Sequence, residues 1–579
     1  MSKGELTLEP GGPAPSTVES KGLKGGALGL LSSIVVGMAS TAPAYSLAAT
    51  LGLIVASGGA LLAGVKAPAI VLIAFIPMYM IAVAYQELNK AEPDCGTTFT
   101  WASRAFGPLI GWLGGWGIIA ADVIVMANLA QIAGAYSFTF VGDLGWHSAA
   151  DLANSTLWST VAGVIWIIVM TYICYRGIEV SARIQYGLLG IELVVLVVFS
   201  IVALVKVYAG KAEAYSLHPS LSWFWPAGLD FGTVIAPAIL TAIFIYWGWD
   251  TAVACNEESE DPGTTPGRAA VISTFLLLAT YALVSVSAIA FAGTGTDGIG
   301  LGNPDNAADA FAAIGPDLFG DSVLGHIGLL LLSASILTSA SASTQTTILP
   351  TARTTLSMGV YRALPQSFAK IHRTYLTPTT STLVMGAVSI GFYVLFTLIS
   401  SNLLSALIGS VGLMIAFYYG LTGFACVWFY RKDLTASARD FVMRGVVPLL
   451  GGLILLVVFA YGLIQYAKPD WLTDADGNNV TIFGFGAVAV VGIGALVLGV
   501  ILMVVWWLMS PDFFRGRTLS RRSSADLVLT PATAVEAHFG LPDSGDMPTV
   551  ISPDLSNLPP GETALNPETG EEFTRGPQA

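Results

Sequence analysis

The chain has 579 residues, of which 54% are hydrophobic and 11% charged, and its mean hydropathy is +0.71. Soluble domains carry roughly 25% charged residues, so the composition excludes a soluble protein with one anchor and indicates a lipid bilayer as the partner. The net charge of −13 arises largely in the C-terminal region and in one loop, and it indicates no nucleic-acid partner.

Twelve apolar tracts recur along the chain, each long enough to cross the ~30 Å hydrocarbon core of a bilayer as a helix. We therefore expect an all-α integral membrane protein with twelve transmembrane helices, at residues 28–52, 68–88, 108–136, 157–175, 184–208, 233–256, 269–292, 325–348, 381–400, 403–430, 446–466 and 483–509. The tracts are expected to lie between an N-terminal segment (1–27) and a disordered acidic tail (511–579).

Two of the tracts are interrupted halfway. The first contains a small, polar, proline-bearing patch from Gly37 to Pro43, and the sixth contains Gly248 and Asp250 at a comparable depth. Because lipid offers no hydrogen bonds, backbone that leaves the helix must be satisfied by protein, cavity water or a ligand. Paired broken helices in the two halves of a chain mark the binding site of secondary transporters. The pattern predicts a carrier of a small polar solute.

The distribution of basic residues predicts the orientation of the chain. Of its 25 Lys and Arg residues, 21 lie on the side that carries both termini, and the other side has only Lys66, Lys206, Lys211 and Lys468. Cytoplasmic loops are enriched in Lys and Arg. We therefore expect a multi-pass protein of the cytoplasmic membrane with both termini in the cytoplasm.

Three stretches resemble the amino acid–polyamine–organocation superfamily. The segment between the second and third tracts is similar to the family signature Y-x-E-L … P-x-x-G-G-x-Y … F-G, with matches at Tyr85, Glu87, Leu88, Pro93, Gly96, Phe106 and Gly107 and departures at Cys95, Thr97 and Phe99. Residues 247–269 are similar to the family's sixth helix, which ends in paired acids and a proline, and residues 352–378 to its basic loop after helix eight.

The resemblance implies a five-plus-five inverted repeat with broken helices 1 and 6, and a substrate bound between the two breaks. It thereby implies a ten-helix transport core (28–430), two additional transmembrane helices (431–510), and cytoplasmic segments before and after them (1–27 and 511–579). Free amides at the start of a half-helix suit a carboxylate, and free carbonyls at the end of another suit an ammonium group. An amino acid needs both. The first break departs from the glycine-rich pattern common in the family, because it keeps Gly37 and adds Pro43, so its carboxylate cradle is expected to be narrower or differently shaped.

The expected substrate-binding residues lie in the two breaks and in the third tract, and Phe244 is also expected to act as an aromatic gate over the substrate. They are Gly37, Met38, Ala39, Ser40, Thr41, Phe244, Ile245, Trp247, Gly248, Asp250 and Asn128. A carboxylate inside a membrane is costly and is a functional hypothesis by default. Two interpretations of Asp250 stay open: it binds a substrate amine, or it accepts structural hydrogen bonds in the broken helix.

Ion coupling is expected at Glu192 and Asp122, with Ser341 from the hydroxyl-rich eighth tract. Glu192 lies in a strongly apolar tract without a neighbouring basic residue, in the region where the resemblance implies a lysine in several sodium-independent relatives. It can shuttle a proton, help to hold Na⁺, or be a neutral structural group, and we favour H⁺ over Na⁺ as the coupling ion. Glu257 and Glu258 are expected to pair with loop arginines as a gate at the cytoplasmic end.

The expected function is a permease that moves amino acids by alternating access, with proton coupling. The alternatives are a polyamine or other organic-cation permease, and an ion transporter on the same fold. The sequence has no metal-ligand cluster, nucleophile elbow or phosphate loop, so we expect no enzyme activity and no cofactor. The expected partners are the small-molecule substrate and the bilayer, with the protein a monomer or weak homo-oligomer.

Overall fold

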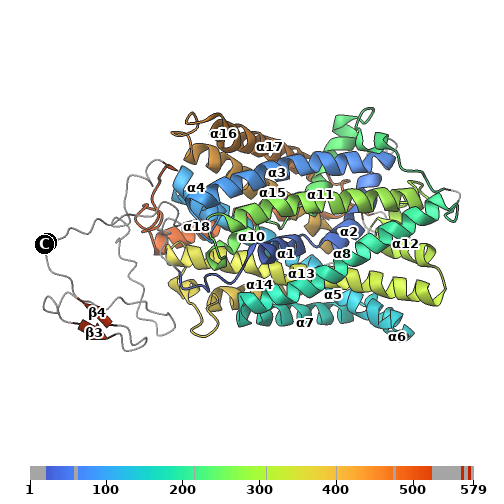
Figure 1. Cartoon of the computed structure of the whole chain (residues 1–579), viewed down its shortest axis with the longest axis horizontal. Helices are drawn as coiled ribbons and strands as arrows, with labels where there is room; N and C mark the ends of the chain where they lie inside the picture. The colour runs from blue at the N-terminus through green and yellow to red at the C-terminus, as the bar shows by residue number, and fades with distance from the viewer. Residues whose placement is uncertain are drawn as a thin grey trace, which may run out of the picture.

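The computed structural model describes residues 21–57, 63–213, 215–307, 309–399, 401–473 and 478–524, together with two short strands. The long helices run side by side along the long axis of the molecule (Figure 1). Within these residues, eleven helical segments are long and apolar enough to cross a membrane. The expected all-α membrane fold is therefore confirmed, and every predicted tract coincides with a helical segment.

The helices that match the tracts are α1 (Leu30–Ser40) with α2 (Pro43–Val55), α3 (Ala67–Ala91), α5 (Pro108–Asp143), α7 (Thr156–Arg176), α8 (Ile178–Tyr208), α9 (Ala236–Ile245) with α10 (Thr251–Ala254), α11 (Thr265–Ala292), α13 (Val323–Val360), α14 (Thr379–Ile399), α15 (Ser401–Phe429), α17 (Val447–Tyr466) and α18 (Ala487–Met509). The other helices are α4 (Thr98–Phe106), α6 (His147–Ala153), α12 (Ala310–Phe319) and α16 (Ala438–Asp440). Short turns of other helix types are η2 (Gly64–Lys66), η3 (Leu221–Phe224), η4 (Phe231–Ile235), η5 (Asn256–Glu258), η6 (Pro304–Asn306), η7 (Gln366–Ala369) and η8 (Phe441–Val446). The strands are β1 (Thr481–Ile482), β2 (Phe485–Gly486), β3 (Thr563–Leu565) and β4 (Glu572–Thr574), paired β1 with β2 and β3 with β4.

The sixth tract is the reason that eleven, and not twelve, segments meet the length criterion. Non-helical turns at residues 246–250 separate the continuous helical segment of η4 and α9 (Phe231–Ile245) from the short pieces α10 and η5. Gly248 has a φ of 122°, which a helix cannot contain. The break that the sequence predicts therefore divides this tract into pieces too short to span a membrane singly.

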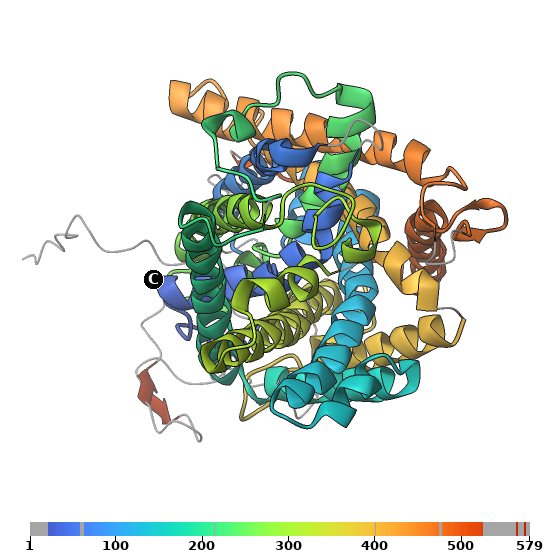
Figure 2. The same ribbon diagram turned by 90° about the vertical axis from the view of Figure 1, so that its right-hand side faces the viewer.

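The first tract lies at the centre of the bundle and the last two lie at its edge. An apolar stretch of 18 residues in the span formed by α1 and α2 is 94% buried inside the protein, against 28% for the corresponding stretch in each of the last two spans. Viewed along the bundle, α1 and α2 (blue) are surrounded by other helices, whereas α17 and α18 (orange to red) lie on the outside (Figure 2). A helix without a lipid-facing side can tolerate polar backbone, because protein groups satisfy it.

Two expectations need correction. The helix of the eighth tract extends beyond residue 348, because α13 continues to Val360 and contains the buried Arg353, while Arg362, Lys370 and Arg373 of the expected basic loop follow it. Residues 511–524 of the expected disordered tail instead pack on the bundle: Phe513 and Leu519 are buried, and the Arg522 amide donates to the carbonyl of Arg104. Apart from β3 and β4, the remainder of the tail lies outside the described residues.

A buried carboxylate fastens α17 and its preceding turns to α3. Glu87 of α3 is fully buried and accepts hydrogen bonds from Lys90 at 2.7 Å, Arg439 at 2.8 Å and Arg444 at 2.9 Å. Since Arg439 lies in α16 and Arg444 in η8, one carboxylate joins the ten-helix region to the segment that follows it.

We expect Glu87→Gln to lower the free energy of unfolding by about 2 kcal/mol, because hydrogen bonds to charged groups contribute roughly 1.5–3 kcal/mol and a neutral amide holds three cations poorly. The thermal unfolding midpoint of the purified protein measures the effect. Glu179→Gln is the control, since Glu179 is half exposed and pairs with Lys24 at the surface. Equal midpoints for the two variants would contradict the prediction.

Candidate functional site

The two helix breaks adopt different backbone conformations. In the first, Thr41 and Ala42 separate α1 from α2, and Ala42 lies in the left-handed region with a φ of 46°. In the second, residues 246–250 separate α9 from α10, with the left-handed turn at Gly248. Both breaks consist of buried residues.

The breaks contact each other at the centre of the bundle. A Cβ atom on Gly248 would lie 2.7 Å from the carbonyl carbon and oxygen of Ser40, so only glycine allows this approach. A Cβ atom added at Gly37 would lie 3.2 Å from the carbonyl oxygen of Trp249, which is also a tight contact. The Ser40 and Thr251 hydroxyls form a hydrogen bond of 2.8 Å. The structure thus brings together the residues expected from the two interrupted tracts.

The start of α2 is fully engaged by hydrogen bonds. Pro43 has no N–H, the Ala44 amide donates to Glu192 Oε1 at 2.6 Å, and the Tyr45 amide donates to Ser339 Oγ at 3.1 Å. The Ser339 hydroxyl in turn donates to Glu192 Oε1 at 2.7 Å. Glu192 of α8 is fully buried, and within the described residues its Oε2 atom has no hydrogen-bond partner. The predicted coupling residue therefore lies directly at the first break.

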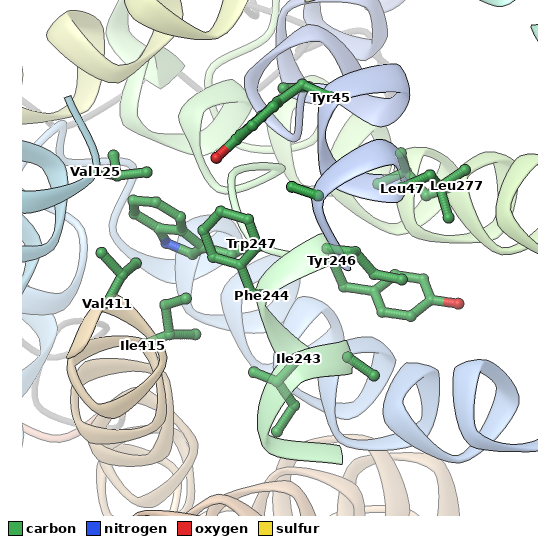
Figure 3. Close-up of a cluster of buried hydrophobic side chains, with 14 of the residues drawn as sticks. Tyr45, Leu47, Val125, Ile243, Phe244, Tyr246, Trp247, Leu277, Val411 and Ile415 are labelled. Carbon is green, nitrogen blue, oxygen red and sulfur yellow. The ribbon is translucent and has the colours of Figure 1, made fainter. Parts of the chain in front are cut away.

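Apolar and aromatic side chains line the region beside the second break. Figure 3 shows Phe244 and Trp247 side by side, with Val125, Val411 and Ile415 on one side of them. The Trp247 indole donates a hydrogen bond to the Tyr418 hydroxyl, and all of these apolar residues are buried. These residues form an apolar cluster beside the second break.

Other expected substrate-binding residues contribute hydrogen bonds around the breaks. The Asn128 side chain accepts a hydrogen bond from the Tyr45 hydroxyl. The carbonyl of Ile245 accepts from the Tyr281 hydroxyl at 2.5 Å, and that of Met38 from the Thr41 hydroxyl at 2.8 Å. The carbonyl of Ala39 accepts from the Ala42 amide at 3.2 Å.

The other two intramembrane acids are engaged by side-chain hydroxyls. Asp250 accepts hydrogen bonds from Tyr418 at 3.0 Å and Tyr419 at 2.8 Å, so the geometry favours its interpretation as a structural acceptor that joins the second break to α15. Asp122 of α5 accepts a hydrogen bond from Thr351 of α13 at 2.5 Å. Ser341 is buried without a hydrogen-bond partner for its hydroxyl among the described residues, while Ser339 makes the contact with Glu192.

The paired acids after α10 close the end of the bundle at which residues 21–29 and 511–524 lie, which we name the terminal face. Glu258 forms a two-point ion pair with Arg353, at 2.7 and 2.9 Å, and both side chains are buried. Glu257 pairs with Lys21 and accepts a hydrogen bond from the Cys95 amide. The partners of the two acids are therefore a lysine of the N-terminal segment and an arginine within helix α13, and not the expected loop arginines.

Lys21, Asp94 and Glu257 form a second cluster, which we name the terminal latch. Lys21 lies 2.9 Å from Asp94, and backbone hydrogen bonds between residues 27–28 and 258–260 hold the N-terminal segment beside it. Asp94 and Glu257, with Cys95, lie close enough together to hold a metal ion, but here the carboxylates bind the Lys21 ammonium.

Ion pairing shifts the pKa values in the latch. Burial alone would raise the pKa of Asp94, but the Lys21 ammonium and hydrogen bonds from Gly96 and Ser357 lower it from its usual 3.8 to about 2. Burial alone would lower the pKa of Lys21, but the carboxylates of Asp94 and Glu257 raise it well above its usual range. The contribution of Asp94 is thus lost only as the pH falls from 3.8 toward 2, and that of Lys21 only as the pH rises through its ordinary value of about 10.4 and beyond.

Several residues of the site were not singled out from the sequence. Tyr45, Thr251 and the pair Tyr418 and Tyr419 satisfy the breaks and Asp250, and Lys21 closes the terminal face. Adjacent tyrosines inside an apolar tract are a usable signal, because a buried hydroxyl needs a partner. Nothing in the sequence marks Lys21, whose partners lie more than 70 positions away.

Comparisons with known proteins agree with this geometry. A family described as amino acid permease matches residues 28–512. A relative from Mycobacterium tuberculosis (strain ATCC 25618 / H37Rv), named as an uncharacterized transporter, is 27% identical over 439 residues, which are 75% of this chain and 86% of the relative. The branched-chain amino acid permease BcaP of Lactococcus lactis subsp. cremoris is 25% identical over 69% of this chain and 82% of its own length.

Among solved structures, MhsT in complex with L-phenylalanine has a TM-score of 0.53 and 16% identity, and the match covers 75% of this chain and 98% of MhsT. This likeness shows a shared fold. Together with the family match, it confirms the predicted superfamily and fold class. The chain belongs to the amino acid permease family, which is a family of multi-pass membrane transporters and not of enzymes.

We expect Gly248→Ala to destabilise the protein by more than about 2 kcal/mol. A non-glycine residue at positive φ costs roughly 1–2 kcal/mol, and the added methyl group meets the backbone of Ser40 at 2.7 Å. The thermal unfolding midpoint tests this, with Gly187→Ala of α8 as control because no atom lies within 4 Å of its added Cβ. A midpoint no lower than that of the control would show that the breaks do not need this contact.

The latch predicts how trypsin attacks the N-terminal segment. At the mildly alkaline pH at which trypsin works, Lys21 should resist cleavage because its ammonium is buried between two carboxylates, whereas the half-exposed Lys24 serves as an internal reference. Asp94→Asn should raise cleavage after Lys21 at least about tenfold, since breaking a buried pair costs roughly 3–5 kcal/mol. Mass spectrometry of the fragments measures the ratio, and an unchanged ratio would mean that the latch does not hold the segment.

Proposed function

We propose that this amino acid permease family member carries an amino acid with an apolar side chain across the cytoplasmic membrane, by alternating access coupled to protons. The observation that carries the proposal is the buried carboxylate of Glu192 at the start of α2, where the two breaks meet. A buried acid beside a broken helix can exchange a proton as the site changes its solvent exposure.

The proposed substrate class follows from the walls of the site. Phe244, Trp247, Val125, Val411 and Ile415 lie together at the second break (Figure 3), and they would contact the substrate side chain. The carbonyl groups at the end of α9 supply a negative dipole end for the ammonium group. BcaP, a relative by sequence, is named for branched-chain amino acids, and MhsT was crystallised with L-phenylalanine.

The polyamine alternative is less well supported. A di- or triamine needs several free carboxylates, but Asp250 is engaged by two tyrosines and Asp122 by Thr351. Sodium coupling has less support than proton coupling for a related reason. The Ser339 oxygen accepts from the Tyr45 amide and its hydrogen is donated to Glu192 Oε1, so these groups satisfy one another without a cation.

Under alternating access, the terminal face is the cytoplasmic end of the pathway, as the excess of Lys and Arg on that side indicates. Inward release requires that Glu258 part from Arg353 and that Glu257 part from Lys21, because these pairs join η5 to α13 and to the N-terminal segment.

Uptake by the purified protein in liposomes tests the proposal, with labelled leucine, phenylalanine, lysine, glutamate and putrescine. We expect leucine and phenylalanine to accumulate with an inward proton gradient and not with an inward sodium gradient. Glu192→Gln should abolish accumulation while leaving downhill equilibration, and Glu179→Gln on the exposed part of α8 should behave as wild type. Accumulation of putrescine alone, or leucine accumulation driven only by sodium, would overturn the proposal.

A further inference from the structure

The start of α2 already holds a carboxyl group of the protein itself, that of Glu192. Its two available amides, of Ala44 and Tyr45, donate to Glu192 and Ser339, and the next amide, of Ser46, donates to the carbonyl of Ala42 at 2.8 Å. Exposed amides and the helix dipole make the start of a helix an anion site. In this conformation the site is occupied by the protein's own carboxylate, in the place where a half-helix would bind the carboxylate of an amino acid.

The hydrogen bonding of the Glu192 carboxyl group at this site is incomplete. Oε1 accepts both hydrogen bonds, from Ala44 and Ser339, while Oε2 is buried without a hydrogen-bond partner among the described residues. An ionised carboxylate offers about four acceptor positions, so half of this group faces no donor. Such a buried oxygen is the natural position for an added proton, since protonation removes a charge that the surroundings satisfy on one side only.

We propose that Glu192 and the substrate carboxylate compete for the start of α2, and that a proton on Glu192 gives this position to the substrate. The inference rests on the proposed function, that is, on an amino acid as substrate. One proton from the outer solution bonds to a Glu192 oxygen and converts the carboxylate into a neutral acid. The Ala44 amide then donates to the incoming carboxylate, so the start of α2 faces one negative charge before the exchange and one after it.

This exchange links the proton to a chemical feature of the substrate. A substrate with a carboxylate needs Glu192 protonated, whereas an amine that lacks a carboxylate leaves Glu192 ionised at the start of α2. Whether transport of a substrate is coupled to protons is therefore expected to depend on the presence of its carboxylate and not on its side chain. Release inside returns the amides to Glu192 as its proton leaves.

Two tyrosines are titratable groups next to Glu192. Tyr281 of α11 is near enough to interact with Glu192 electrostatically, and Tyr45 of α2 follows Ala44, whose amide donates to Glu192. Helix α1 has no titratable side chain, and Arg353 of α13 lies fourteen residues beyond Ser339, roughly 21 Å along the helix. Other titratable residues of the helices packed against α8 are Tyr172, Cys174, Tyr175 and Arg176 of α7, Arg268 of α11, Asp317 of α12 and His326 of α13.

Equilibrium binding to the purified full-length protein tests the proposal. The probes are leucine and 3-methylbutylamine, which is leucine without its carboxylate, titrated between about pH 5 and pH 8, where the amine keeps its charge. We expect the affinity of wild type for leucine to fall at least about tenfold as the pH rises, because the substrate loses a charge-assisted hydrogen bond. The affinity for the amine should change less than about twofold.

Two variants and one control sharpen the result. In Glu192→Gln, leucine affinity should no longer depend on pH, while Glu179→Gln should keep the wild-type profile. Ser339→Ala removes one donor from the Glu192 carboxylate and should move the loss of leucine affinity to higher pH, because hydrogen bonds stabilise the charged form; this variant answers the question if Glu192→Gln does not fold.

A wild-type pH profile in Glu192→Gln, or in Ser339→Ala if Glu192→Gln does not fold, would overturn the inference, and so would equal pH profiles for leucine and the amine. Either result would leave the proposed function standing if liposomes still accumulate leucine. If no amino acid binds or accumulates at any pH, the proposed function itself fails and the inference fails with it.

Discussion

The centre of this protein depends on one constraint: backbone groups at membrane depth must find their hydrogen bonds within the protein. An unpaired amide or carbonyl in an apolar environment costs several kcal/mol, and two helices are interrupted at the same depth. Side chains of neighbouring helices supply the missing partners. Glu192 and Ser339 satisfy the start of α2, the Ser343 hydroxyl donates to the carbonyl of Ser40, and the Tyr281 hydroxyl donates to that of Ile245.

The same constraint separates the three intramembrane acids. Asp250 has a hydroxyl donor on each oxygen, and Asp122 links α5 and α13 through Thr351. Both therefore act as joints between helices. Glu192 instead accepts a backbone amide with one oxygen and leaves the other without a partner among the described residues. Of the three acids, Glu192 therefore has the carboxylate whose stability changes most when it gains a proton or when a second anion approaches.

Much of the fold could be predicted from the sequence, because apolar length and the distribution of basic residues report directly on membrane spans. The breaks at Gly37–Pro43 and Gly248 were predictable for the same reason, since small and polar residues interrupt an apolar tract. The rotation of a helix about its axis was not. Ser339, Ser341 and Ser343 belong to one hydroxyl-rich run, but two residues turn a helix by about 200°, so Ser339 and Ser343 face the first break while Ser341 does not. Long-range pairs such as Lys21 with Asp94 depend on tertiary packing, which a single sequence does not report.

The site and the terminal face are joined by a short piece of chain. Thr251 at the start of α10 bonds to Ser40, and Glu258 at the end of η5 holds Arg353. Glu258 lies only seven positions after Thr251, roughly 10 Å along a helix, and the six residues between them are buried except for the partly exposed Glu257. A movement of η5 that frees Glu258 must therefore also disturb the contact between the two breaks. Because packed interiors rearrange between discrete arrangements and deform little, opening of the terminal face and rearrangement of the site are expected to occur as one event.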